Sequence, residues 1–130
     1  MQFKLKEQDI LDYLDLHFPE ERFEKGRLLV GQDKREDLAI YYFGETFAAC
    51  VIAGFNTFEY NEAFKVDYSA IEQIKLKDGL LFRKLIIQTD QGKLKYGTSR
   101  LLLSDFQKQN YNDFIKGEKQ RIIYENGKFI

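Results

Sequence analysis

The alternation of apolar and charged side chains in the middle of the chain is the feature that most constrains its fold. Residues 74–77 read Ile-Lys-Leu-Lys and residues 93–96 read Lys-Leu-Lys-Tyr, so every second side chain is apolar and the others are mostly lysines. Successive side chains of a β-strand point to opposite faces. This period of two therefore predicts strands that bury one face and expose the other to water.

Short runs rich in Val, Ile, Tyr, Phe and Thr extend this pattern over residues 23–98, with Gly, Asn and Asp between them. Such runs predict an antiparallel sheet over residues 23–98. Residues 48–53, Ala-Ala-Cys-Val-Ile-Ala, are apolar throughout, which is typical of a strand covered on both faces. The candidate strands are 27–31, 38–43, 46–53, 57–60, 64–68, 71–77, 84–89 and 93–97.

Helices are predicted on both sides of the sheet region. Residues 7–18 place Ile10, Leu11, Leu14, His17 and Phe18 on one helical face, and Pro19 prevents the helix from continuing. A second helix is predicted over residues 104–116. It begins with the capping box Ser-Asp-Phe-Gln at 104–107, in which the Ser hydroxyl and the Gln side chain each bind the other residue's backbone N–H. The glycine at 117 is placed to end it in a left-handed conformation.

Turn signals predict two hairpins. Residues 89–92, Thr-Asp-Gln-Gly, lie between two alternating strands, and Asn126-Gly127 lies between two short apolar runs. Asn-Gly is the strongest two-residue hairpin signal. We therefore expect a hairpin over residues 121–130, although its partner in the fold stays open.

Length and composition indicate one domain over residues 1–130, because hydrophobic residues make up 44% and charged residues 32% of the 130-residue chain. With 1 Cys and 1 His, neither a disulfide framework nor a multi-cysteine zinc module fits. Nucleotide-binding glycine motifs are also missing from the sequence. We expect Cys50 to lie in the core, and we expect no metal site, no catalytic residues and no cofactor.

A cytoplasmic location is the expectation from the N-terminal region and from hydropathy. The first residues contain no apolar segment of the kind that a secretory signal needs. No apolar stretch has the length of about 18 residues typical of a membrane-spanning helix.

Charge is balanced overall but divided between the two halves of the chain. The net charge of −1 argues against nucleic-acid binding, which depends on neutralising many phosphates. Residues 1–70 carry 8 basic and 14 acidic side chains, whereas residues 71–130 carry 12 basic and 7 acidic ones. The two halves can attract each other, or the basic half can present a binding surface.

A basic face is the candidate binding site. Strand alternation assigns Lys75, Lys77, Lys93 and Lys95 to the side of the sheet that faces water. Clustered cations of this kind attract anionic lipid headgroups or acidic protein surfaces. The alternative is a solvated face whose lysines pair with Glu72 and Asp90. The wider series from which the four residues are taken also contains Arg83, Lys84 and Arg100.

A run of aromatic residues is the second feature. It interleaves with acidic residues, which is unfavourable for stacking nucleic-acid bases because the accompanying cations are missing. We expect it to line the core, with a ligand-binding barrel or an enzyme site around Tyr60 and Tyr68 as the alternative. Its members are Phe55, Phe58, Tyr60, Phe64 and Tyr68.

Residues 64–98, together with the capped helix that follows, resemble the bacterial pleckstrin-homology-like domain family. The similarity rests on Tyr68-x-x-Ile71-x-x-Ile74, a turn at Gly79, the strand 84–89, the turn 90–92, the returning strand 93–96 and the amphipathic helix. The resemblance implies a strongly bent antiparallel sheet, or split barrel, closed at one end by the C-terminal helix. It implies no enzyme and supplies no catalytic residues.

The sequence thus predicts an α+β domain with a mainly antiparallel sheet, an N-terminal helix and a C-terminal capping helix. We expect a non-catalytic interaction module that binds a protein or peptide partner or associates with itself. A peripheral module that binds anionic membranes through the basic face is one alternative, and a small-molecule-binding barrel is the other.

Overall fold

One antiparallel sheet dominates the computed structural model, which describes residues 5–32, 37–54, 59–79, 83–98 and 104–130. Within these residues the sheet has nine strands in the order β4-β3-β2-β1-β7-β6-β5-β8-β9, and it is open, with β4 and β9 at its edges. The fold is therefore α+β, as predicted. The strands are β1 (Leu28–Gln32), β2 (Asp37–Phe43), β3 (Ala48–Gly54), β4 (Tyr60–Val66), β5 (Ile71–Asp78), β6 (Arg83–Thr89), β7 (Gly92–Thr98), β8 (Gln120–Glu125) and β9 (Lys128–Phe129).

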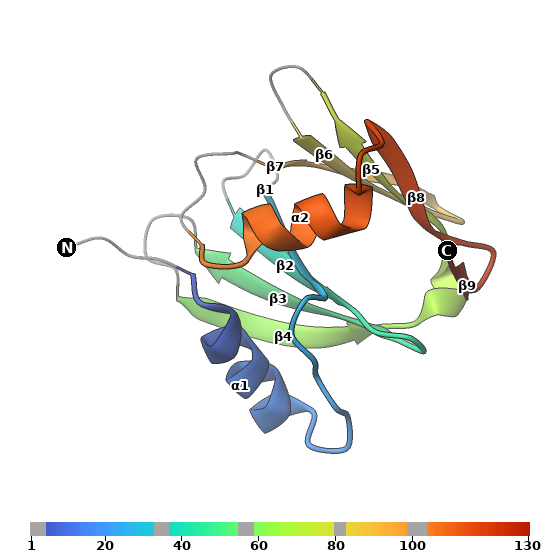
Figure 1. Ribbon diagram of the computed structural model, residues 1–130. Coiled ribbons are helices and arrows are strands. Elements are labelled where there is room, and N and C mark those ends of the chain that lie inside the picture. The colour runs from blue at the N-terminus through green and yellow to red at the C-terminus, as the bar shows by residue number, and fades with distance from the viewer. Residues whose placement is uncertain (1–4, 33–36, 55–58, 80–82, 99–103) are drawn as a thin grey trace.

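The sheet bends sharply where its two halves meet. Among the described residues, strands β1 and β7 share a single residue pair, Gln32 with Gly97, and the half-sheets diverge from this join (Figure 1). Tyr96 packs directly on Gly31: a Cβ atom on this glycine would lie 2.5 Å from the Cβ of Tyr96. The close approach of the two strands at the bend therefore requires glycine at position 31.

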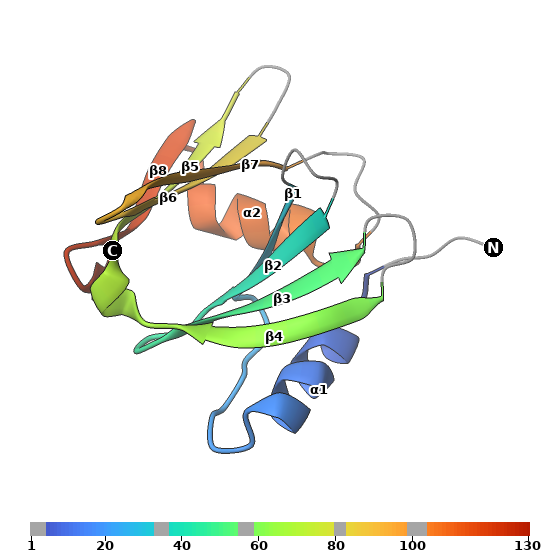
Figure 2. The same cartoon turned by 180° about the vertical axis from the view of Figure 1, so that it is seen from behind.

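Helix α2 (Gln107–Ile115) lies between the two half-sheets, as Figures 1 and 2 show from opposite sides. The hydroxyl of Ser104 accepts the backbone N–H of Gln107 at 3.0 Å, as predicted, but the helix begins three residues later than predicted, with Phe106 as its N-cap residue. The other half of the capping box is wrong, because the Gln107 side chain binds Val30 of β1 instead. The helix ends at a left-handed Lys116, and Gly117 also has a positive φ of 85°.

Helix α1 (Glu7–His17) covers the opposite face of strands β1–β4. It buries Ile10, Leu11 and Leu14 against them, and Phe18 also packs against this cluster, whereas His17 of the predicted apolar face is exposed. The N–H of Phe18 closes the helix by donating to the carbonyl of Leu14 at 2.8 Å. The helix thus ends one residue before the predicted boundary.

Two apolar clusters hold these layers together. One lies between the half-sheets and includes Tyr111 of α2, and the other lies between α1 and the outer face of β1–β4. Alternate residues of β3 belong to different clusters, with Cys50 in the first and Val51 in the second. The prediction of a strand covered on both faces at 48–53 is therefore confirmed.

Other strand predictions need correction. Segments 57–60 and 64–68 were predicted as two strands, but residues 60–66 form the single strand β4, and Tyr68–Ala70 form a 3₁₀ helix. Residues 57 and 58 lie outside the described part. The sheet is also not limited to residues 23–98, because β8 pairs with β5. Both predicted hairpins are present, with two-residue turns at 90–91 and 126–127.

Candidate functional site

The four lysines of the predicted basic face lie on one side of the second half-sheet. Lys75 of β5 and Lys95 of β7 both pair with Ile86 of the intervening strand β6, and Lys77 pairs with Lys84. Directly opposed residues of antiparallel strands share a face. The register therefore brings together a group that we call the lysine face: Lys75, Lys77, Lys84, Lys93 and Lys95.

The spacing on this face follows from strand geometry. Lys77 and Lys84 are directly opposed, which places their Cβ atoms about 5 Å apart. Lys75 and Lys95 are two strands apart, so their Cα atoms are about 10 Å apart. These separations are close to the Debye length of about 8 Å at physiological ionic strength, so the charges act together on an approaching anion.

The lysine face is open to water and its charges are uncompensated. Four of its side chains are exposed and Lys75 is half-buried. In the described part of the chain none of the five forms an ion pair, although pairing with Glu72 and Asp90 was the alternative reading. Glu72 accepts a hydrogen bond from Gln88 at 3.3 Å instead. Direct ion pairs among the described residues therefore do not neutralise the five lysines.

Lys84 belongs to this face although it was not among the four chosen residues, and its position directly opposite Lys77 makes it central. Arg83 of the same basic series lies on the other side of β6. Its guanidinium stacks on the ring of Tyr111 at 4.7 Å, and its Nε lies 3.6 Å from the Asp78 carboxylate. Strand alternation signals both positions, because Arg83 has the parity of the buried Leu85. Arg100 lies outside the described residues.

The aromatic run does not form one site. Tyr60 is half-buried against Tyr13 of α1, whereas Phe64 is 41% exposed near the edge of the sheet. Tyr68 is buried, and its hydroxyl donates to the carbonyl of Gly44 at 2.6 Å. Burial also raises the pKa of Tyr68 above its usual value. The expected core-lining role thus holds for Tyr68, is partial for Tyr60 and is wrong for Phe64. Phe55 and Phe58 lie outside the described residues.

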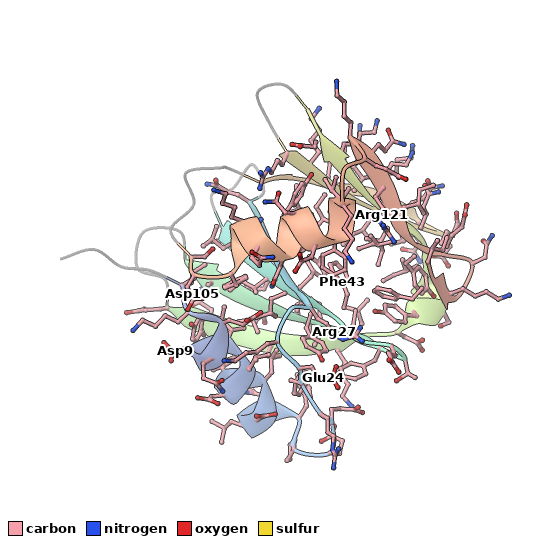
Figure 3. All side chains as sticks on the ribbon, in the orientation of Figure 1. Asp9, Glu24, Arg27, Phe43, Asp105 and Arg121 are labelled. Atoms are coloured by element: carbon pink, nitrogen blue, oxygen red, sulfur yellow. The ribbon has the colours of Figure 1, made fainter. Side chains whose placement is uncertain are left out.

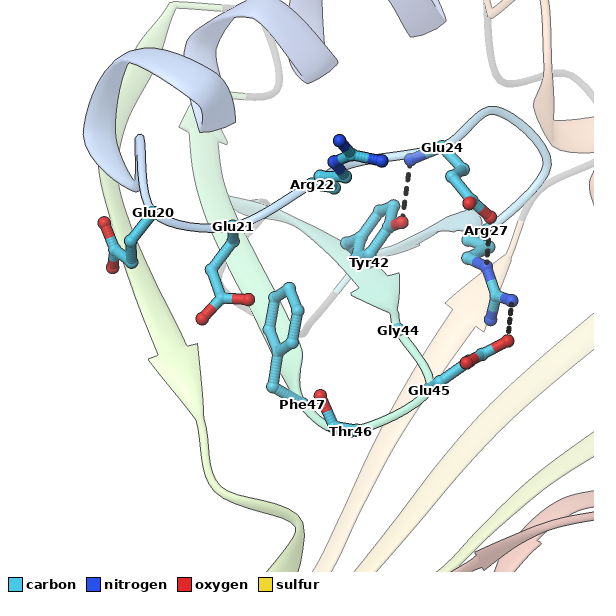
Figure 4. Close-up of a pocket in the computed structure, with 10 residues that line it drawn as sticks. All are labelled: Glu20, Glu21, Arg22, Glu24, Arg27, Tyr42, Gly44, Glu45, Thr46 and Phe47. Atoms are coloured by element: carbon cyan, nitrogen blue, oxygen red, sulfur yellow. Dashed lines mark hydrogen bonds and ion pairs between the residues drawn. The ribbon is translucent and has the colours of Figure 1, made fainter.

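An open cleft of about 430 Å³ lies between the segment that precedes β1 and the β2–β3 turn (Figure 4). Arg27 makes three polar contacts in its wall. Its Nε lies 3.5 Å from the Glu24 carboxylate and its Nη2 lies 3.5 Å from the Glu45 carboxylate. Its Nη1 donates a hydrogen bond to the carbonyl of Phe43 at 3.0 Å. Glu20 and Glu21 on the same wall are both paired with Lys65. These charges are compensated within the protein, in contrast to those of the lysine face.

A second open cleft, of about 600 Å³, lies between the β2–β3 and β8–β9 turns. The rings of Tyr68 and Tyr124 line it, and their centroids are 4.5 Å apart. The Tyr124 hydroxyl donates to the backbone carbonyl of Tyr68 at 3.0 Å. Both tyrosine hydroxyls in this cleft are thus engaged with the protein backbone.

Cys50 and His17 are the residues whose side chains are best suited to catalysis, but they lie in different surroundings. Cys50 is buried, and burial raises the pKa of its thiol to about 12, so that it is protonated at neutral pH. His17 is exposed at the end of α1, with Nδ1 2.9 Å from the Tyr13 carbonyl oxygen. Among the described residues, no group of three potential metal-ligating side chains comes together.

Comparisons with known proteins identify no relative. The chain matches no protein-family model, and neither the curated proteins nor the solved structures give a significant match. Within its described part, neither helix has the length and apolar character needed to cross a bilayer.

Proposed function

We propose that this protein is a non-catalytic, cytoplasmic interaction module of the pleckstrin-homology-like type, and that its lysine face binds an acidic protein surface. The observation that carries the proposal is the register of β5, β6 and β7, which gathers five lysines on one exposed surface, where none of them forms an ion pair with a described carboxylate. The resemblance implies a bent antiparallel sheet with a C-terminal helix, and the bent antiparallel sheet of this protein, followed by α2, supports that part of the proposal.

The shape of the lysine face favours a protein partner. The side chain at its centre, Ile86, is half-buried, as is Ile122, which pairs with Lys75 from β8. The lysines thus surround two partly covered apolar side chains, an apolar floor, rather than a fully exposed apolar group that can enter a bilayer. The net charge of −1 supplies no long-range attraction to an anionic membrane either.

The test is binding of a labelled oligoglutamate peptide, followed by fluorescence anisotropy at two ionic strengths. Binding should be strong near 0.01 M salt, where the Debye length is about 30 Å, and should vanish near 1 M, where it is about 3 Å. Each lysine near an anionic surface contributes roughly 1 kcal/mol. The quadruple variant K75Q/K77Q/K93Q/K95Q should therefore bind at least about tenfold more weakly.

A matched control separates the lysine face from the overall charge. The variant K25Q/K108Q/K116Q/K119Q loses the same four charges from exposed positions outside the face, and it should bind the peptide as the parent does. Equal weakening by both variants would reduce the effect to net charge and contradict the proposal. Recruitment to phosphatidylserine vesicles without peptide binding would favour the membrane alternative instead.

A further inference from the structure

The lysine face and the outer side of α1 lie at opposite ends of the molecule. Helix α1 covers one face of β1–β4, and the other face of these strands shares the inner cluster with β5, β6 and β8. The outer surfaces of this stack are therefore α1 on one side and the lysine face on the other. In Figure 1 strands β5, β6 and β8 lie at the upper right and α1 at the lower left, and Figure 3 labels Asp9 on the α1 side in the same orientation.

The outer side of α1 carries negative charge around one apolar side chain. Asp9, Asp12 and Asp15 are exposed and follow one another at intervals of three residues, so they share the helix face opposite the buried one. Leu16, 78% exposed, lies within the same arc. We call these four residues the acidic stripe. None of its three carboxylates forms an ion pair in the described structure.

The acidic stripe and the lysine face match in charge, in length and in the position of their apolar residues. Asp9 and Asp15 are six residues apart, which is about 9 Å along a helix. Lys75 and Lys95 are about 10 Å apart on either side of Ile86. An exposed leucine among carboxylates thus corresponds to an apolar floor among lysines, which is the arrangement of an interface core inside a polar rim.

We propose that the acidic partner of the lysine face is the acidic stripe of a second copy of this chain. This inference rests on the proposed function, because it names the partner of the same surface. Since the two surfaces lie at opposite ends, one contact leaves a free lysine face on one copy and a free acidic stripe on the other. Such a heterologous contact adds copies head to tail instead of closing a twofold dimer.

Sedimentation velocity over a range of protein concentrations tests the inference. Near 0.01 M salt the average mass should rise above that of one copy as the concentration increases, and near 1 M salt it should return to that of one copy. The lysine-face variant K75Q/K77Q/K93Q/K95Q and the stripe variant D9N/D12N/D15N should each remain single at all concentrations. The control K25Q/K108Q/K116Q/K119Q should assemble like the parent.

The decisive experiment mixes the two variants that should not assemble on their own, the lysine-face variant and the stripe variant. The lysine-face variant retains its acidic stripe and the stripe variant retains its lysine face, so the mixture can form one contact and should stop at pairs. A separate substitution, Leu16→Ser, should weaken assembly of the otherwise unchanged chain at least about tenfold, because it removes the apolar centre. Circular dichroism of each variant establishes that it is folded.

The outcomes distinguish this inference from the proposed function. A parent protein that stays single at low salt but binds oligoglutamate would overturn self-assembly and leave the lysine face as a docking site for another acidic protein. A parent that does neither would overturn both. Assembly that survives in the lysine-face variant, or a mixture that grows beyond pairs, would show that other surfaces make the contact.

Discussion

The side-chain amide of Gln107 pairs with both backbone groups of Val30, as a neighbouring strand would. Its Oε1 accepts the Val30 N–H at 2.9 Å, and its Nε2 donates to the Val30 carbonyl at 3.0 Å. Asn110, one helical turn later, donates to the carbonyl of Leu28 at 2.9 Å. Helix α2 thus provides partners for three backbone groups of β1, the N–H and carbonyl of Val30 and the carbonyl of Leu28, which a neighbouring strand would otherwise have to satisfy.

Replacement of Gln107 by Ala should therefore lower the free energy of unfolding by more than is usual for an uncharged polar residue. The change leaves the buried N–H and carbonyl of Val30 without partners, and each unsatisfied group costs about 1 to 3 kcal/mol. We expect the free energy of unfolding in urea to fall by roughly 2 to 5 kcal/mol on this basis. The control is Gln109→Ala, because Gln109 is exposed and binds only Asp113. A small loss like that of the control would contradict the strand-like role of Gln107.

Ser104→Ala should lower the free energy of unfolding by about 1 kcal/mol, the usual cost of a lost helix cap. The Gln107 side chain does not bind back to the cap, so only the bond from the Gln107 N–H to the Ser104 hydroxyl is lost. Lys108→Ala, at an exposed position of the same helix turn, is the control. Equal urea midpoints for the Ser104 variant and its parent would remove the cap from the account of this helix.

Neighbouring positions on β6 should respond differently to truncation. Leu85 is fully buried in the inner cluster, whereas Ile86 faces outward and is half-buried among the lysines. Leu85→Ala should cost about 2 to 5 kcal/mol because it leaves a cavity in the core. Ile86→Ala should cost less, since part of its side chain is already in water. The reverse order in thermal or urea unfolding would mean that the register of this strand is wrong.

The pH dependence of stability should include a contribution from Cys50. Its pKa is raised from 9.0 to about 12 by burial, so above pH 9 the unfolded chain releases a proton that the folded protein retains. This contribution is fully present below pH 9 and is lost as the pH rises toward 12. The slope is about 1.4 kcal/mol per pH unit. Between pH 8 and pH 10 the parent should lose roughly 1 kcal/mol more than Cys50→Ala.

The same measurement can also contradict the prediction for Cys50. Tyr41 and Tyr68 also have raised pKa values, so both the parent and the Cys50 variant will lose stability in alkali. Only the difference between the two proteins reports on the thiol. If the free energy of unfolding depended on pH identically in both proteins, Cys50 would ionise equally easily in the folded and unfolded chains. The thiol would then not be buried in the folded protein.

Local features were the most predictable from the sequence. The Asn126-Gly127 turn was recognisable because both residues have the positive φ that this dipeptide favours. The sharing of one face by the four chosen lysines followed from alternation and from consecutive hairpins. The inward position of Arg83 carried a signal that was missed, since it is two residues before the buried Leu85.

Contacts between distant segments could not be predicted in this way. The pairing of β8 with β5 joins residues more than 40 positions apart, and no local pattern encodes it. The Ser-x-x-Gln spacing indicated a reciprocal cap, but the Gln107 side chain instead forms hydrogen bonds with the backbone of Val30 at the edge of β1. The proposed role of the exposed Leu16 in self-assembly likewise could not be predicted, because it depends on the positions of α1 and the lysine face in the folded molecule.

The single pair that joins β1 to β7 also bears on how the protein folds. Strands β1–β4 are consecutive antiparallel neighbours, and so are β5–β7, so each group closes through short connections with a small loss of chain entropy. Sequence-distant contacts slow folding most. Here they are concentrated in α2, in β8 and at the Gln32–Gly97 join. The two meanders can therefore form early, and the rate-limiting event is expected to be their docking around the helix.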